Sequence, residues 1–102
     1  MTEFNKLVRD KIPEIMSAKG ETPITKILND AEYGLYLEKK LDEEVAEYHC
    51  SKELEELADI LEAVYALCES KGFSVDDLLS VYREKHNQRG GFSKKILLIG
   101  KE

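Results

Sequence analysis

The sequence lacks the features that would mark a membrane or secreted protein. It has no run near the roughly 20 apolar residues that cross a bilayer. The segment Met1 to Asp10 is polar, without the apolar region of a secretion signal. Cysteine is scarce: Cys50 and Cys68 stand alone, without a Cys-x-x-Cys spacing, which suits a reducing compartment. We therefore expect a cytoplasmic protein with no membrane partner.

The chain also lacks the excess of basic residues that binding to nucleic acids requires. Its 102 residues include 21 acidic and 15 basic side chains, which gives a net charge of −6. Because a phosphate backbone attracts clustered Lys and Arg, we expect no nucleic-acid partner. A single nucleotide could still bind if metal ions offset the local negative charge.

Only two prolines occur, and no repeat or low-complexity tract divides the chain, so we expect one domain over residues 1–102. Hydrophobic periodicity predicts an all-α fold with a short helix inside 6–18 and longer ones over 31–49, 52–71 and 75–87. Pro13 fits the first turn of the short helix. Two short apolar runs, at 24–28 and 96–99, predict a minor two-stranded β element.

The helix predicted over 52–71 is apolar on nearly all sides, as the segment LADILEAVYALC (residues 57–68) shows. Its main apolar stripe consists of Leu54, Leu57, Leu61, Val64 and Cys68. Only a short turn precedes it, with Ser51 as the expected cap, so it should form an antiparallel hairpin with the helix over 31–49. A small chain has few elements to cover such a helix, and we expect oligomerisation to complete the bundle.

Acidic residues interrupt the apolar stripe of the helix over 31–49. With Leu37 set at zero and about 100° per residue, Glu44 falls near 340°, inside the stripe, and Glu47 lies on its edge. A carboxylate that faces a core is costly unless it is paired or bound to a metal. Glu38 and Asp42 fall on the far face, where we expect ordinary solvated charges.

The next helix offers a matching acidic pair, because Glu56 and Asp59 share a face at a spacing of three. The hairpin would bring this pair opposite Glu44 and Glu47. Clustered carboxylates repel one another, and a hard divalent cation relieves the repulsion. All-oxygen ligands favour Mg²⁺ or Mn²⁺. The alternative is a solvated acidic face on a non-catalytic helical interaction module.

Basic residues gather at two places in this acidic chain. Lys85 and Arg89 lie one turn apart near the end of the last helix, and Lys6, Arg9 and Lys11 cluster near the N-terminus. Both groups are candidates for contacts with phosphate. For Lys85 and Arg89, compensation of the helix dipole is an equally good explanation. For Lys6 and Lys11, an ordinary structural role is favoured.

The segments KLDEEVAEY (residues 40–48) and EELADILEAVYAL (residues 55–67) resemble the MazG-like, all-α nucleoside triphosphate pyrophosphohydrolase superfamily. The signature of that superfamily is EExxE followed by ExxD, and the matching residues are Glu43, Glu44, Glu47, Glu56 and Asp59. The opening NKLVRDKIPEIM and the late RGGF resemble a short single-domain branch labelled phosphoribosyl-ATP pyrophosphohydrolase-like. Only eight residues separate Glu47 from Glu56, fewer than in many members.

The resemblance implies one MazG-like domain that uses Mg²⁺ to hydrolyse a nucleoside triphosphate to the monophosphate and pyrophosphate, as a homodimer or homotetramer. The implied metal ligands are Glu44, Glu47, Glu56 and Asp59. The implied catalytic residues are Glu43 and Glu44, and the phosphate-binding residues are Lys85, Arg89 and Arg9. Hydrolysis of phosphoribosyl-ATP in histidine synthesis is the alternative reaction on the same fold.

Overall fold

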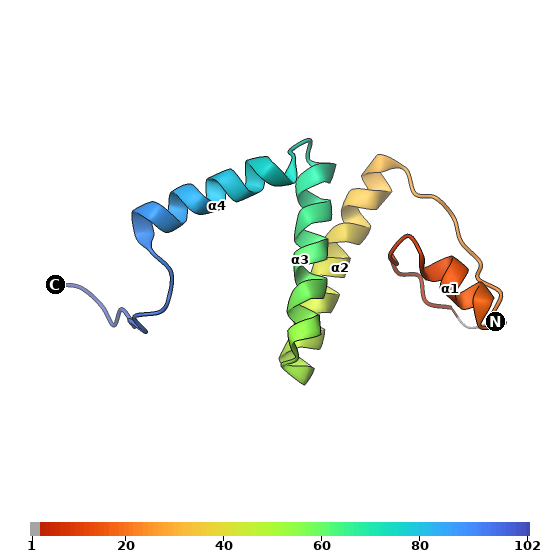
Figure 1. Cartoon of the computed structure of the whole chain (residues 1–102), viewed down its shortest axis with the longest axis horizontal. Helices are drawn as coiled ribbons and strands as arrows, with labels where there is room; N and C mark the ends of the chain where they lie inside the picture. Colours follow the sequence, from red (N-terminus) through yellow and green to blue (C-terminus); the bar gives the residue numbers. More distant parts are fainter. Residues whose placement is uncertain (1–2) are drawn as a thin grey trace.

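The computed structural model describes residues 3–102, and all regular secondary structure in that range is helical (Figure 1). The predicted all-α class is therefore confirmed. The helices are α1 (Ile12–Ala18), α2 (Asp30–Ser51), α3 (Leu54–Ser70) and α4 (Val75–Arg89). None of those described combines the length and the apolar character that crossing a bilayer requires.

The two predicted strands are wrong, because residues 24–28 and 96–99 are neither strand nor helix. An apolar run becomes a strand only when a neighbouring strand satisfies its backbone hydrogen bonds. Ile27 is 96% exposed and Ile99 is 94% exposed, so neither run lies against such a neighbour.

Two helices begin with capping boxes that the sequence encodes. At the start of α2, the Asn29 side chain accepts a hydrogen bond from the Glu32 N–H at 2.8 Å, and the Glu32 carboxylate accepts one from the Asn29 N–H. Ser74 and Asp77 make the same reciprocal pair at the start of α4. Each box satisfies amide groups that the first turn of a helix leaves without partners.

The link between α2 and α3 has two residues, as predicted, but it lies at residues 52–53 instead of 50–51. Ser51 is the last residue of α2 rather than the cap of α3, and its hydroxyl accepts a hydrogen bond from the Glu53 N–H at 3.2 Å. Lys52 turns the chain with a left-handed backbone, at a φ of 59°. This tight turn sends α3 back along α2, and the two form the antiparallel hairpin of Figure 1.

The hairpin holds what little core the chain has. Leu37 and Ala63, one from each helix, are the buried hydrophobic residues among residues 3–102. In Figure 1, α4 leaves the end of α3 and runs away from the hairpin, while α1 lies on the other side. The Cα radius of gyration is 17.9 Å, against about 13 Å for a compact chain of this length. The chain is therefore a central hairpin with two outlying arms.

Candidate metal centre

Four carboxylates from the two hairpin helices converge near the turn. One oxygen each of Glu44, Glu47, Glu56 and Asp59 can be chosen so that all lie within 4.8 Å of one another. The first two lie on α2, one turn apart, and the other two lie on the first turns of α3. The structure thus brings together all four of the predicted ligands. We call this group the carboxylate cluster.

Glu44 is the buried member of the carboxylate cluster, with only 5% of its surface exposed. Its position inside the apolar stripe of α2 explains the burial, as the helical spacing predicted. One carboxylate oxygen, Oε1, lies 3.0 Å from the Lys40 ammonium, but the other, Oε2, is buried without a hydrogen-bond partner. Such an oxygen is costly to bury, and a bound cation would satisfy it. The residues present therefore fit a hard metal ion.

Lys40 is a site residue that the motif analysis missed. Its ammonium lies 3.0 Å from Glu44 and 3.5 Å from Glu43, one turn further along the same helix. Burial by itself lowers the pKa of Lys40, but the hydrogen bond to Glu44 and the charge of Glu43 outweigh it and raise the pKa overall. The spacing of three and four residues to two acids could have revealed this role.

Glu47 lies at the open edge of the carboxylate cluster. Interaction with the Glu44 carboxyl raises the pKa of Glu47 above its ordinary value, and the charges of Glu43 and Glu56 add to the effect. The shift has the direction expected when carboxylates are crowded and each disfavours the ionised form of the next. A divalent cation at this place would reverse that balance.

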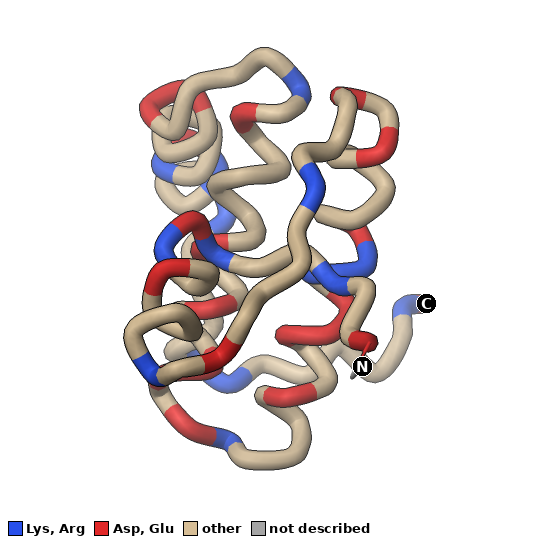
Figure 2. Tube along the Cα trace, turned by 90° about the vertical axis from the view of Figure 1, so that its right-hand side faces the viewer, with Lys and Arg blue, Asp and Glu red and all other residues tan. Residues whose placement is uncertain are grey.

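The N-terminal segment supplies cations to the same region. The Arg9 guanidinium lies 2.7 Å from an oxygen of Asp59, and the Lys6 ammonium lies 3.6 Å from Glu43. These pairs join the start of the chain to the hairpin. In Figure 2, acidic and basic positions are mixed over the molecule rather than gathered in one large patch of either sign. Arg9 therefore lies beside the carboxylate cluster.

The structure does not bring Lys85 and Arg89 to the carboxylate cluster of their own chain. From Asp59 to the end of α3 at Ser70 the helix rises about 16 Å, and α4 then continues away from the hairpin (Figure 1). Their predicted role in phosphate binding therefore has no support from the arrangement within one chain.

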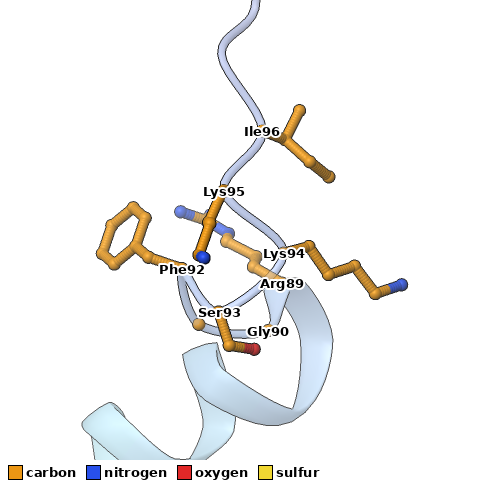
Figure 3. A pocket seen from close by; sticks show the side chains of 8 residues that line it. Arg89, Gly90, Phe92, Ser93, Lys94, Lys95 and Ile96 are labelled. Atoms are coloured by element: carbon orange, nitrogen blue, oxygen red, sulfur yellow. The ribbon is translucent and has the colours of Figure 1, made fainter.

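Arg89 instead borders a hollow of about 340 Å³ in the loop that follows α4. Lys94 and Lys95 also line it, but the charged ends of the three side chains point in different directions in Figure 3. Phosphate recognition needs donors that converge on one group. The hollow is therefore a weaker candidate for phosphate binding than Arg9 beside the carboxylate cluster.

Comparison with known proteins gives a relative but no family. No family model matches the chain, and no solved structure matches it. An uncharacterized protein from Mycolicibacterium smegmatis is 58% identical over 41 residues. That stretch is 40% of this chain and 42% of the relative, so the likeness covers less than half of either protein.

Proposed function

We propose that the protein is a Mg²⁺-dependent nucleotide pyrophosphohydrolase of the MazG-like type. The observation that carries the proposal is the carboxylate cluster, with the unpartnered Oε2 of the buried Glu44 inside it. Four of the five residues that resemble the EExxE and ExxD signature converge in space, and the fifth, Glu43, lies beside them. A purely solvated acidic face would not bury a carboxylate between two helices.

The four carboxylates would hold the metal on the hairpin, and the substrate triphosphate would bind at the exposed side, near Glu47. A bound Mg²⁺ would neutralise charge and would lower the pKa of a water molecule. Glu43, which lies beside the cluster and contacts Lys6 and Lys40, would take the proton from the attacking water. The water oxygen bonds to the α-phosphorus, and the bond from phosphorus to the bridging oxygen breaks. The products are a nucleoside monophosphate and pyrophosphate.

The basic residues fit this scheme to different degrees. Arg9 pairs with Asp59 across the carboxylate cluster, and a bound metal would release it to contact a phosphate. Lys85 and Arg89 can reach a carboxylate cluster only from a second chain, since α4 carries them away from their own. The active form under this proposal is a homodimer or homotetramer, with Mg²⁺ or Mn²⁺ as cofactor and a nucleotide as substrate.

A non-catalytic helical interaction module is the rival function, and a different observation favours it. Leu54, Leu57 and Leu61 expose apolar surface along α3, as a helix that binds partners would. This rival predicts no affinity for Mg²⁺. Hydrolysis of phosphoribosyl-ATP remains the alternative reaction for the same metal centre.

The deciding experiment measures pyrophosphate release from NTPs, dNTPs and phosphoribosyl-ATP, with and without Mg²⁺, together with Mg²⁺ binding by calorimetry. We expect Mg²⁺-dependent release from at least one compound, and loss of both binding and release in Asp59→Asn. The matched control is Glu38→Gln, an exposed acid of α2 outside the cluster. A folded protein that neither binds Mg²⁺ nor releases pyrophosphate from any compound would overturn the proposal in favour of the interaction module.

A further inference from the structure

The chain exposes far more surface than a folded single chain of its mass. Its accessible surface is 9152 Å², whereas a compact monomer of 11.7 kDa exposes about 5,900 Å². The excess is about 3,300 Å² per chain, or about 6,600 Å² over two chains, which is more than the total of about 2,000 to 5,000 Å² that permanent subunit interfaces commonly bury. An excess of exposed surface of this size needs another chain to cover it, because no single loop or short segment could do so.

Part of the exposed apolar surface lies on one side of α3. Leu54, Leu57 and Leu61 are 76%, 46% and 47% exposed. Val64 and Cys68 continue the same line, and at about 100° per residue all five fall within about 80° of one another. The opposite side of α3 faces α2. The hairpin therefore covers one side of this helix and leaves its longest apolar stripe open.

The open stripe leads into a groove where α4 leaves α3. The groove has a volume of about 330 Å³, and Val64, Cys68, Phe73, Leu78 and Val81 supply its apolar lining. Its size is near the lower end of the range for pockets that enclose a ligand, about 300 to 1,000 Å³. Groove and stripe form one continuous apolar surface, which we call the α3–α4 face.

The same chain carries an apolar segment with nothing to cover it. Residues 96–99 read Ile-Leu-Leu-Ile, and each side chain is at least 80% exposed. The segment follows Gly90-Gly91 and extends away from the helices in Figure 1. Four consecutive aliphatic side chains in water are unfavourable, at about 25 cal/mol for each Å² of apolar surface.

We propose that a second copy of this chain covers the α3–α4 face, and that its residues 96–99 occupy the groove between α3 and α4. Each copy has one open apolar groove and one uncovered apolar segment, so a two-fold exchange fills both grooves with both segments. A foreign partner would fill the groove but leave the segment exposed. The assignment does not depend on the proposed hydrolysis, because its test needs no substrate.

The first test is the state of association, measured by sedimentation equilibrium. The wild-type chain assembles at least as a dimer, and Leu98→Asp weakens the association about thirtyfold, the effect of losing one central interface contact. Gly100→Asp adds the same charge two residues further on, outside the apolar run, and leaves the association unchanged. A wild-type chain that sediments as a monomer at all concentrations overturns the proposal.

The second test joins the segment to the groove by a disulfide and uses the native thiol of Cys68. In Leu98→Cys combined with Cys50→Ser, oxidised glutathione links the new thiol to Cys68 of another chain and is itself reduced. Peptide mass spectrometry identifies the joined residues, and the dimer band on a non-reducing gel disappears when Cys68→Ser is added. A bond to Cys68 of the same chain, or no bond to Cys68 in an assembled protein, contradicts the placement of residues 96–99 in the groove of the second copy.

Discussion

The two sides of α3 differ in a way that inverts the usual arrangement of a surface helix. The side facing α2 carries Glu56 and Asp59 next to the buried Ala63, whereas the outward side carries Leu54 and Leu57. A surface helix normally turns its apolar stripe inwards and its charges outwards. Acids held inside need a counter-charge, and leucines held outside need a covering surface. The inversion supports a metal centre on one side of α3 and a subunit contact on the other.

The largest expected effect comes from a substitution of Glu44, a residue of α2 that lies in the carboxylate cluster opposite Glu56 and Asp59. Glu44→Gln keeps the size of the side chain but removes the charge from the buried member of the carboxylate cluster. We expect Mg²⁺ affinity and pyrophosphate release to fall by about a hundredfold or more, because this residue is a direct ligand in the proposed centre. Calorimetry and the release assay measure the two quantities.

Asp42→Asn is the control for that variant, because Asp42 is an exposed acid on the same helix. Circular dichroism shows whether both variants keep their helices. If Glu44→Gln retains wild-type Mg²⁺ affinity and activity while folded, the carboxylate cluster is not the metal centre.

A substitution with a smaller expected effect tests how the side of α3 that faces α2 is packed. Ala63 is 5% exposed where α3 meets α2, so Ala63→Leu forces a larger side chain into the hairpin. We expect the free energy of unfolding to fall by about 1–3 kcal/mol, the usual cost of overpacking. Urea denaturation at one fixed protein concentration measures it. Ala58→Leu, at an exposed position of α3, should change stability by less than about 0.5 kcal/mol, and equal effects would contradict the packing described.

The inner side of the hairpin could be predicted from the sequence because helical geometry is local. A spacing of 3.6 residues per turn places Glu44 among apolar neighbours and puts Glu56 and Asp59 on one face. The short link around Ser51 then predicts that the two helices pack antiparallel as a hairpin. The capping residue Asn29 followed by Glu32 marks the start of α2 for the same local reason.

Which side of α3 would remain uncovered could not be predicted, since it depends on which surfaces meet in the fold. The stripe of Leu54, Leu57 and Leu61 has the period of a core stripe, yet α2 packs on another side of α3. The alternation in residues 24–28 suits a strand but supplies no pairing partner. The distance of Lys85 from the carboxylate cluster depends on the direction in which the chain leaves α3, which periodicity does not encode.

The two capping boxes allow a matched comparison between the hairpin and the α4 arm. Asn29→Ala removes the cap of α2 and should lower the free energy of unfolding by about 1 kcal/mol. Ser74→Ala removes the same cap from α4, which has no buried residues, so we expect faster amide hydrogen exchange in α4 alone. A loss of global stability in Ser74→Ala equal to that in Asn29→Ala would show that the arm and hairpin unfold as one unit.

The α2 capping box also predicts a dependence on pH. The hydrogen bond from the Asn29 backbone, together with Lys26, lowers the pKa of Glu32. A carboxyl group with a lowered pKa in the folded state stabilises the fold above its ordinary pKa, and this contribution is lost as pH falls through the lowered value. The difference in stability between wild type and Glu32→Gln should therefore shrink on acidification, as urea denaturation at several pH values would measure.

The smallest effect concerns Arg9, which links the N-terminal arm to the carboxylate cluster. Its ion pair with Asp59 is 2.7 Å long but about half exposed, so Arg9→Ala should cost less than about 1 kcal/mol of stability. Without nucleotide, the guanidinium competes with a cation for Asp59, and its removal should tighten Mg²⁺ binding a few-fold. With nucleotide, the loss of a phosphate donor should raise KM.

The opposite directions of these two changes separate a phosphate-binding role of Arg9 from a structural one. Lys11→Ala is the matched control, since Lys11 belongs to the same basic opening but lies at the start of α1 and should alter neither quantity. If Arg9→Ala weakens Mg²⁺ binding in the absence of nucleotide, Arg9 supports the carboxylate cluster rather than competing with the cation. In that case the N-terminal arm is part of the metal centre, and the hairpin alone does not define it.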